Sequence, residues 1–585
     1  MTGVFLHGVD TVESLSGTVS VVEVSSSVIA IFGTSEKKSA GNFYHTTGLK
    51  EAEAEYGEGT ILKTLRRIHS YVEGHSVIGF PLGKDSDFSG AKTVLKPAFG
   101  DVSFSSSTAT IAVADGQGSP VQVHNPKSKT LTYTSSEVAH ATVDAHTGVV
   151  TPVAAGSTTI EAAIDGGGSV SYTLNVTAAN ANSAKTDGGG ALSASELHVY
   201  VGNQAQAVTV INPHSQVLSY QSDDTSVATV DANTGKVTPL SAGSAVITVT
   251  LAEKVDGVTT YFAKTLSYNL TVELYSDTLL AAFKTALPLL RKTRQRLGFF
   301  PKINLAPGIL NKPGAAGLAV NAVRGIRGQW YGDVPHDVTD VDGAYRFKQN
   351  FADQRMVWCW PPVKVINKDG AQEVMDLATS IAGLTAQVDK NLTGDAKVAT
   401  GYWCSASNYV LPDVVGPSVE LDYIPNDADC DVNRLNASGI VTVMNRAGWR
   451  AFGNYSSAYP ENNDMLSFVS WRRSADVIEE SIEYFTLQWL DKPMFTGPTD
   501  FMSSVAGRVR DSINDYLAAK VGTSLVAFNV SILPKDNPIT ELMKGNVTVR
   551  YKITPPVPMQ TVEYQAVINP QGLEEAFKQL VGGSQ

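Results

Sequence analysis

The stretch Asn445–Pro493 reads NRAGWRAFGNYSSAYPENNDMLSFVSWRRSADVIEESIEYFTLQWLDKP and joins an aromatic half to a helical half. In the helical half, apolar residues recur at steps of three and four, which is typical of a helix with one buried face. The apolar positions are Val477, Ile478, Ile482, Phe485, Leu487 and Leu490, and the other face carries Glu479, Glu480 and Glu483. Ser474 is the predicted N-cap and Pro493 the predicted stop.

The aromatic half combines bulky side chains with glycines. Aromatic rings bury a large apolar area, and glycine permits backbone turns that other residues disfavour. The residues concerned are Trp449, Phe452, Tyr455 and Tyr459, with Gly448 and Gly453. The whole stretch is therefore predicted to be a core element.

Length and charge limit the class of protein. A chain of 585 residues is too long for one core, so about three to five domains are expected. The net charge of −12 argues against nucleic acid as the main partner. We find no apolar run long enough for a membrane span and no signal peptide. Cys359, Cys404 and Cys430 lack metal-ligand spacing and are predicted to be buried thiols in a reducing compartment.

The N-terminal part has an α/β pattern. Val19–Val24 and Val28–Phe32 are predicted strands, and Thr60 begins a helix whose apolar side ends before Gly74. Val77–Phe80 then returns as a buried strand. This order predicts the start of a parallel sheet. The segment before Val19 has no obvious partner and is predicted to be an arm.

An internal repeat interrupts this pattern. Between Phe99 and Glu273 there is no Arg, Trp or Cys. LTYTSSEVAHATVDAHTGVVTPVAAGSTTI, starting at Leu131, aligns without a gap to LSYQSDDTSVATVDANTGKVTPLSAGSAVI, starting at Leu218, 87 positions later. Short alternating strands with Asn, Asp and Gly turns predict two all-β sandwiches. The polar segment Ala178–Gly190 is the predicted linker between them.

The repeat region is acidic, with 14 Asp and Glu against 6 Lys. A solvated outer surface explains this charge, and we favour that interpretation. A receptor-binding or glycan-binding module is the alternative.

After the repeats the α/β pattern resumes, which places them inside a loop of one discontinuous domain, between Phe80 and Asp277. Helices and strands again alternate. The predicted elements are a helix at Leu279–Leu297 kinked by Pro288, a strand at Ile303–Ala306, a helix at Ala315–Arg327, a strand at Met356–Trp360 and a largely helical segment at Gly370–Leu392.

No catalytic motif is present in this domain: we find no nucleophile elbow, phosphate loop, HExxH pair or paired thiols. The acidic loop Asp333–Gly343 offers carboxylates and His336 as ligands for a hard cation, but it departs from the calcium-loop spacing, so a turn-forming loop is favoured. Cys404, Ser405 and Ser407 share a loop, yet no histidine follows His336. The chain is therefore predicted not to be an enzyme, with no cofactor and no metal.

The C-terminal part contains a predicted helix at Thr499–Val521 with a basic edge, then antiparallel strands at Val526–Leu533 and Asn546–Ile553. After a proline-rich break, Met559–Ile568 alternates apolar and polar residues as a strand does, and a short helix follows Pro570. An isolated strand of this kind either adds to another subunit's sheet or packs on its own domain.

Two resemblances follow from these motifs. ATVDA-x-TG-x-VTP followed by AGS, present in both repeats, resembles the group 2 bacterial immunoglobulin-like domain of intimin-type surface proteins. The rest of the chain resembles the contractile-tail sheath proteins of bacteriophages and pyocins. The residues that carry this second resemblance are HGVDTVE, VSSSVIAIFGTS, INLAPGI, RMVWCWPP, GIVTVMNRAGWRAFGNYSS and FVSWRRSADVIEESIEYF.

The sheath resemblance implies a structural, non-enzymatic subunit that forms stacked hexameric rings around a tail tube and contracts to drive the tube through the host envelope. It implies a subtilisin-like α/β domain without a triad, and terminal arms that insert as strands into a neighbour's C-terminal domain. By position, the arm residues are Val4, Leu6, Val9 and Val12, with Val562, Tyr564, Ala566 and Ile568. The resemblance decides for strand addition.

The resemblance also implies that the C-terminal domain faces the tube. Candidate core residues, or contacts to the tube or a neighbour, are Trp449, Arg450, Trp471, Arg472, Arg473, Arg508 and Arg510. For Arg472 and Arg473, an ion pair within the subunit is the simpler interpretation.

The predicted fold class is multidomain α/β and α+β: a discontinuous subtilisin-like domain with tandem inserted immunoglobulin-like sandwiches, and an α+β C-terminal core. The predicted domains are an arm and strand at 1–25, the α/β domain at 26–98 and 274–438, the sandwiches at 99–178 and 191–273, the C-terminal core at 439–558 and an arm at 559–585.

Expected partners are other copies, the tube protein, and baseplate and tail terminator proteins, with no nucleic acid and no membrane insertion. The expected location is the virion, after assembly in the host cytoplasm. A surface adhesin or glycan-binding protein is the alternative function, which the repeats favour and the missing secretion signal opposes; a hydrolase is opposed by the absent site.

Overall fold

The structure is a computed structural model of the whole chain. It describes residues 20–88, 93–95, 102–104, 107–113, 121, 123–124, 130–165, 167–178, 188–205, 207–257, 259–261, 263–367, 369–393, 400–495 and 504–582. The predicted N-terminal arm residues Val4, Leu6, Val9 and Val12, and most of the predicted linker Ala178–Gly190, lie outside the described residues.

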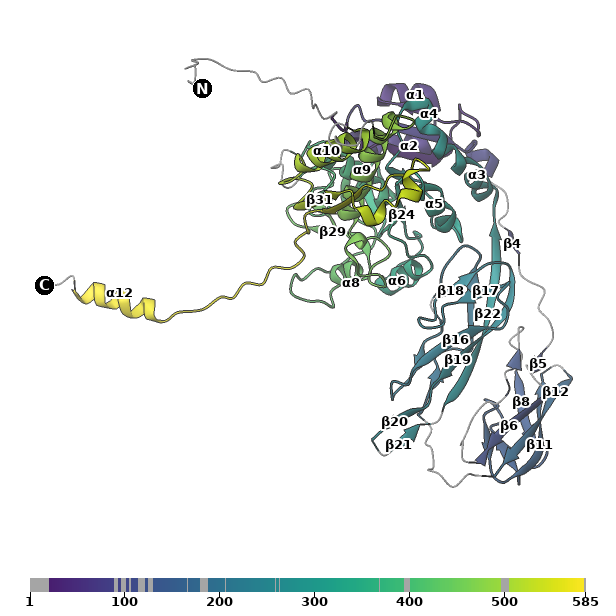
Figure 1. Cartoon of the computed structure of the whole chain (residues 1–585). Helices are drawn as coiled ribbons and strands as arrows, with labels where there is room; N and C mark the ends of the chain where they lie inside the picture. Colours follow the sequence, from purple (N-terminus) through teal and green to yellow (C-terminus); the bar gives the residue numbers. More distant parts are fainter. Residues whose placement is uncertain are drawn as a thin grey trace, which may run out of the picture.

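An eight-stranded, mostly parallel sheet forms the centre of the body (Figure 1). Its strand order is β2-β3-β1-β23-β24-β25-β29-β30. The six inner strands pair in parallel, and β2 and β30 are antiparallel strands at the two edges. The strands are β1 (Ile29–Gly33), β2 (Tyr44–Thr46), β3 (Val77–Pro81), β23 (Ile303–Leu305), β24 (Gln329–Asp333), β25 (Met356–Cys359), β29 (Ile440–Asn445) and β30 (Trp449–Phe452).

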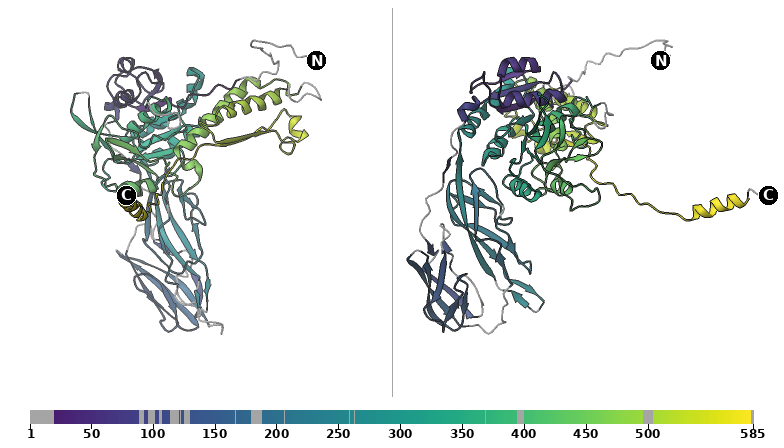
Figure 2. Two further views of the ribbon diagram at one scale, coloured as in Figure 1. Left: turned by 90° about the vertical axis from the view of Figure 1, so that its left-hand side faces the viewer. Right: turned by 180° about the vertical axis from the view of Figure 1, so that it is seen from behind.

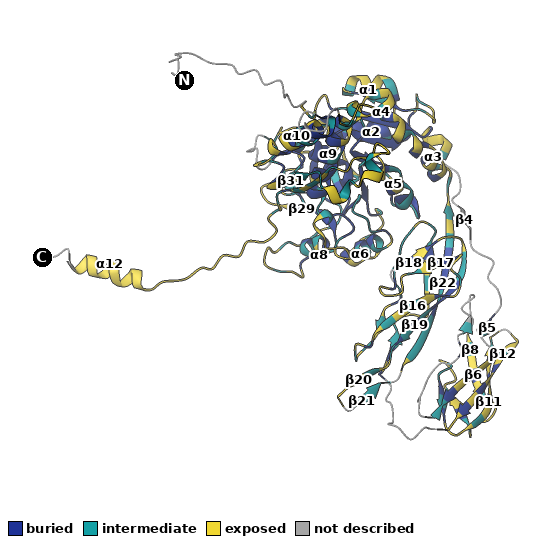
Figure 3. Cartoon of the chain, viewed as in Figure 1, coloured by how far each residue is buried: buried dark blue, intermediate teal, exposed yellow. Residues whose placement is uncertain are grey.

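Helices cover both faces of this sheet, because successive residues of a strand point to opposite faces. Ile29 and Ile31 of β1 pack with α1 (Leu49–Tyr56), α2 (Thr60–Tyr71) and α7 (Leu377–Asp389). Ala30 and Phe32 pack with the other face's helices, which are α3 (Thr278–Ala286), α5 (Ala315–Arg324), α6 (Val341–Gln349) and α8 (Asp431–Ala437). Figure 3 shows the resulting buried centre.

Most predicted body elements are present, with four corrections. Val19–Val24 forms no strand over its described residues, 20–24. The predicted helix Leu279–Leu297 divides at Pro288 into α3, a 3-10 segment (Leu287–Lys292) and α4 (Thr293–Leu297). Strand β24 and helix α6 were not predicted. The segment Gly370–Leu392 begins with a strand, β27 (Gln372–Met375), which joins β26 (Val363–Ile366) and β28 (Val414–Pro417) in a small sheet.

Two all-β modules lie between β3 and α3 in the chain. Module 1 contains the sheet β6-β12-β11-β8, and module 2 contains β14-β22-β19-β16. Strands β8 to β11 of module 1 lie 87 positions before β16 to β19 of module 2, so the sequence repeat is a structural repeat. Module 1 has β6 (Thr108–Ala112), β8 (Leu131–Ser135), β9 (Ala141–Val143), β10 (Val150–Pro152), β11 (Gly156–Ile164) and β12 (Ser169–Thr177); module 2 has β14 (Glu196–Tyr200), β16 (Leu218–Ser222), β17 (Ala228–Val230), β18 (Val237–Pro239), β19 (Gly243–Leu251) and β22 (Lys264–Ser276).

Module 2 adjoins the body, and module 1 lies farther out (Figures 1 and 2). Asn203 Oδ1 accepts a hydrogen bond from Gly314 N at 2.7 Å, and Gln204 N donates to Asn350 O at 2.5 Å. Gly314 has φ +77°, and a Cβ there would meet Val201 O at 2.5 Å. The contact between module 2 and the body thus requires glycine at this position.

A C-terminal layer packs beside the sheet. It consists of α9 (Val469–Thr486), α10 (Val505–Ala518) and the antiparallel hairpin β31 (Ala527–Ser531) and β32 (Arg550–Thr554). Its apolar core includes Ile478, Ile482, Ile513 and Leu517. The predicted boundary between residues 438 and 439 is wrong, because β29 and β30 belong to the main sheet of the body.

The chain end extends away from the body (Figure 1). Residues 559–568 form no strand and are exposed, and α12 (Gln571–Gly582) stands at the end of this segment. Within the described part of the chain, no helix combines the length and apolar character needed to cross a membrane.

Candidate functional site

The β31–β32 hairpin offers two open edges. Within the described part of the chain its sheet consists of these two strands alone. Phe528, Val530, Tyr551 and Ile553 pack toward the core of the C-terminal layer, which fixes the hairpin's register. Each outer edge therefore presents backbone N–H and C=O groups that can pair with an added strand.

In the C-terminal segment, residues 559–568, apolar and polar residues alternate as they do in a strand. The segment pairs with no strand in the described part of its own chain. Tyr564 is 87% exposed and Ile568 is 93% exposed, and Val562 and Ala566 are also exposed. The following helix α12 exposes Leu573, Phe577 and Leu580. The alternative in which this strand packs on its own domain is not what the structure shows.

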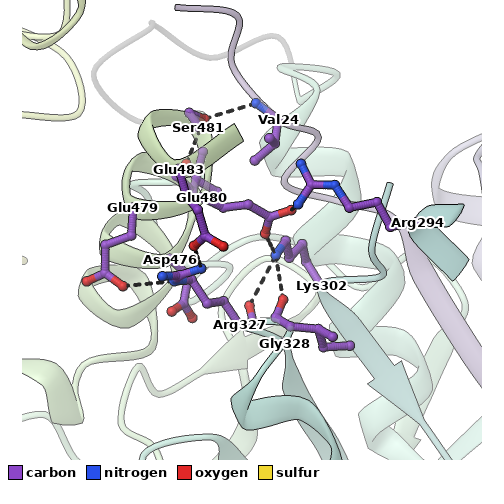
Figure 4. Close-up of polar contacts among 12 residues, drawn as sticks. Val24, Arg294, Lys302, Arg327, Gly328, Asp476, Glu479, Glu480, Ser481 and Glu483 are labelled. Carbon is purple, nitrogen blue, oxygen red and sulfur yellow. Dashed lines mark hydrogen bonds and ion pairs between the residues drawn. The ribbon is translucent and has the colours of Figure 1, made fainter. Parts of the chain in front are cut away.

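The root of the N-terminal arm is held against α9. Val24 N donates to Ser481 Oγ at 3.0 Å (Figure 4), and Arg473 donates to Ser26 O at 3.2 Å. Glu23 forms an ion pair with Lys520, just beyond α10. Residues 21–26 thus lie along the C-terminal layer before the chain enters β1.

The root of the C-terminal segment is held by the same helix. The indole of Trp471 is buried, and its Nε1 donates to Pro556 O at 2.8 Å. Pro556 lies two residues beyond β32. Helix α9 therefore contacts the chain at two places: just before it enters the body at β1, and just after it leaves the body at β32.

Arg472 and Arg473 form ion pairs within the chain, which is the simpler of the two interpretations. Arg473 makes a two-pronged contact with Asp389, at 2.9 and 2.5 Å, and both side chains are buried. Asp389 raises the pKa of Arg473 above its ordinary value and so keeps it charged despite burial. Arg472 pairs with Asp476 at 2.9 Å.

The other candidate contact residues are more accessible. Trp449 Nε1 donates to Val415 O at 3.0 Å, and Arg450 donates to Asn408 O at 2.6 Å. Arg508 is exposed on α10, and Arg510 pairs with Asp511 at 2.7 Å. A contact of these residues with a tube or a neighbour stays a prediction.

The glutamates of α9 do not share a solvent face. Glu480 is 3% exposed and pairs with Lys302 and with Arg294 (Figure 4). Leu487 and Leu490, predicted to be buried, are exposed. The buried pair was missed because its basic partner lies 178 residues away in the sequence.

The acidic loop caps helices. Asp340 Oδ1 accepts from Gly343 N at 2.7 Å at the start of α6, and Asp333 Oδ1 accepts from Ala378 N at 2.9 Å at the start of α7. His336 pairs with Asp376 at 2.7 Å, which raises the pKa of the imidazole. Over the described ranges, no group of three or more His, Cys, Asp or Glu could hold a metal ion.

The Cys404 loop lacks the properties of a nucleophile. Burial raises the pKa of the Cys404 thiol to about 11, so it stays protonated at neutral pH. Ser407 Oγ accepts a hydrogen bond from Gly453 N at 3.0 Å and serves the backbone of the neighbouring loop. Cys359 and Cys430 are buried free thiols.

Comparison with known proteins relates the chain to phage tails. The tail sheath protein of Burkholderia phage BcepMu is 32% identical over 304 residues, covering 50% of this chain and 60% of that protein. Over this half of its length, the chain is similar to phage tail sheath proteins. The major tail sheath protein of Serratia phage KSP20 is 24% identical over 300 residues, covering 51% of this chain and 71% of that protein.

Further similarities concern the inserted module and solved structures. The intimin immunoglobulin-like domain family matches residues 216–253, within module 2. A sheath tail protein from Desulfitobacterium hafniense is 10% identical, with a TM-score of 0.38, covering 91% of this chain and 94% of that chain. The curated relatives are named as sheath proteins and not as enzymes, in agreement with the expectation from the sequence.

Proposed function

We propose that this chain is the structural subunit of a contractile phage tail sheath. The observation that carries the proposal is its 32% identity with the tail sheath protein of phage BcepMu over 304 residues. The matched region spans 60% of that relative, so the function of the whole protein is part of the proposal.

The proposed subunits are joined by strand addition. The exposed segment Met559–Ile568 supplies the free strand, and the β31–β32 hairpin of another copy supplies the open edge. Backbone hydrogen bonds provide affinity in such a contact, and alternate side chains provide register. The N-terminal arm, with Val4, Leu6, Val9 and Val12, takes the other edge in this proposal.

The proposed assembly is a stack of hexameric rings around a tail tube, ended by baseplate and tail terminator proteins, in the virion after assembly in the host cytoplasm. Contraction drives the tube through the host envelope. The arms keep subunits connected by backbone hydrogen bonds while their bodies rotate. We further propose that the body has a subtilisin-like arrangement without a triad and that both modules are immunoglobulin-like, for which the match at 216–253 is the support.

Electron microscopy of the purified full-length chain tests this function. We expect tubes of regular diameter, because the open edges and free strands are complementary between copies. A variant lacking residues 559–585 should keep the tryptophan fluorescence of the folded body, since residues 559–581 are exposed, and should form no tubes. Tubes from the truncated chain would contradict strand addition, and persistent monomers from the full chain would contradict the sheath function.

A further inference from the structure

A row of basic residues stands at the amino edge of the parallel sheet. Lys302 immediately precedes β23, Arg327 lies two residues before β24, and Arg355 immediately precedes β25. These three strands are neighbours in the sheet. Since the amino ends of parallel strands meet at one edge, the three cations line up there. Arg294, the second residue of α4, joins the row.

Helix α9 presents a matching stripe of carboxylates. Its acidic residues are Asp476, Glu479, Glu480 and Glu483, a spacing that places them along one side of a helix. Asp476 binds both Arg355 amino groups, at 2.7 and 2.9 Å. Glu480 pairs with Lys302, and Arg327 pairs with Glu479 at 3.1 Å and also with Glu483 (Figure 4).

The central part of this contact is buried. Lys302 is 5% exposed and Asp476 is 2% exposed. Lys302 Nζ also donates to Ile326 O at 2.7 Å, so a carbonyl completes its coordination. A buried ion pair is stable only where its two charges meet, because either charge left alone in the interior is costly. The ion pairs thus fix the position of α9 on the body.

Other side chains of α9 hold the two places where the chain leaves the body. Ser481 and Arg473 bind the backbone of residues 24 and 26, and Trp471 binds Pro556 O. Ile478 and Ile482 pack into the core that supports the β31–β32 hairpin. One helix therefore connects the body, both arm roots and the hairpin.

We infer that α9 is the joint through which neighbouring subunits pull on the body, fastened to the amino edge of the sheet by the row of ion pairs. This inference rests on the proposed sheath function for the origin of the pull, but the fastening is a property of the single chain. A pull on residue 24 or 556 is carried by α9 into three strands at once.

Hydrogen exchange of the full-length monomer tests the fastening. Glu480→Gln removes the counter-charge of buried Lys302, and we expect amides of 469–486 and Val24 to exchange at least tenfold faster, with β1, β23 and β24 unchanged. Arg434→Gln is the matched control, because it removes a cation from an exposed pair with Asp342 in the same body. It should leave exchange in α9 unchanged.

A paired replacement separates fastening from charge. Lys302→Met with Glu480→Leu puts apolar contact in place of the buried pair, which is often tolerated when both charges are removed together. We expect exchange in α9 to return to within threefold of the wild type, and tube yield, reduced at least fivefold in Glu480→Gln, to recover with it. If Glu480→Gln unfolds the chain, Glu483→Gln takes its place, because Glu483 is exposed and pairs with Arg327. The same faster exchange of α9 is then expected.

If the amides of α9 and Val24 exchange at the wild-type rate in both Glu480→Gln and Glu483→Gln, the inference is overturned. Loosening of α9 without any loss of tubes from a chain whose wild type forms them would also overturn it. If the wild-type chain forms no tubes, the sheath function fails, while the exchange result still decides whether α9 is fastened by these ion pairs.

Discussion

Asp333 is a carboxyl group that the body keeps away from water. Burial, together with the nearby Asp376, raises its pKa well above the ordinary value. Its Oδ1 accepts from Ala378 N, a role that an amide oxygen can also fill. The ionised form of Asp333 therefore destabilises the folded state, and the hydrogen bond from Ala378 N does not need that charge.

We expect Asp333→Asn to stabilise the body at neutral pH. The folded pKa is raised, so the stability contributed by the protonated carboxyl is complete below the unfolded pKa of about 3.9 and is lost as the pH rises through the folded pKa. The gain should be near zero at pH 4 and about 1–2 kcal/mol at pH 7.5, at about 1.4 kcal/mol for each pKa unit.

Urea unfolding followed by tryptophan fluorescence measures this gain. No Trp lies between Phe99 and Glu273, so the signal reports on the body and the C-terminal layer without the modules. Asp337→Asn, exposed in the same loop, is the control and should shift neither curve. An equal gain at both pH values would show that ionisation of Asp333 is not the cause.

Single residues were predictable where their partners are close in sequence. The acidic loop was assigned as turn-forming from its own residues, and Asp340 indeed caps a helix three residues before Gly343. Glu480 could not be placed, because helical spacing alone does not reveal that Lys302 will stand opposite. A signal was present in the basic residues before β23, β24 and β25, but it becomes readable only when the strands are known to be neighbours.

The backbone N–H and C=O groups of residues 559–568 pair with no other strand of the described chain. In a strand added at an edge, alternate N–H groups face the new partner. Tyr564→Pro with Gln565→Pro removes one such donor in either register. We expect no tubes from this variant, and a free energy of unfolding within about 0.5 kcal/mol of the wild type, because both side chains are exposed.

Tyr564→Thr with Gln565→Thr is the matched control, since threonine keeps the N–H group and favours extended backbone. It should still form tubes in negative-stain images. Equal tube yields from the proline and threonine variants would rule out backbone pairing by this segment.

Helix α9 shows why element boundaries escaped prediction. Ser474 has the residue type of an N-cap, yet the helix begins at Val469 and Ser474 lies inside it, with its Oγ donating to Ser470 O. The actual start is satisfied by Asn454, whose backbone oxygen accepts from Val469 N at 2.9 Å and whose Oδ1 accepts from Ser470 N at 3.3 Å. A cap supplied from 15 residues upstream leaves no local signal.

On the scale of the whole chain, repetition was the most informative signal. A period of 87 residues predicted two copies of one module, and the resumed α/β pattern placed them in a loop of the body. The boundary at 438/439 failed for a different reason. Strands β29 and β30 follow a long connection after β25, and their pairing with it is a tertiary contact that local patterns do not carry.

The two chain segments that connect the insertion to the body pair with each other, so the insertion can be removed without separating them. Strand β4 (Thr93–Leu95) pairs antiparallel with the end of β22, and Leu95 lies opposite Leu274. The two chain positions are thus a cross-strand pair, about 5 Å apart at Cα. A two-residue Asn-Gly turn can replace residues 96–273, because this turn suits antiparallel strands.

We expect this excised chain to fold and to form tubes. The loss on the body side is the contact of module 2 with Gly314 N and Asn350 O, two hydrogen bonds worth about 0.5–1.5 kcal/mol each. The free energy of unfolding of the body should therefore fall by about 1–3 kcal/mol, measured by tryptophan fluorescence in urea. Electron microscopy then compares tube yield and diameter with the full chain. Normal fluorescence without tubes would show that the modules take part in contacts between subunits, whereas narrower tubes of normal yield would place them on the outer surface.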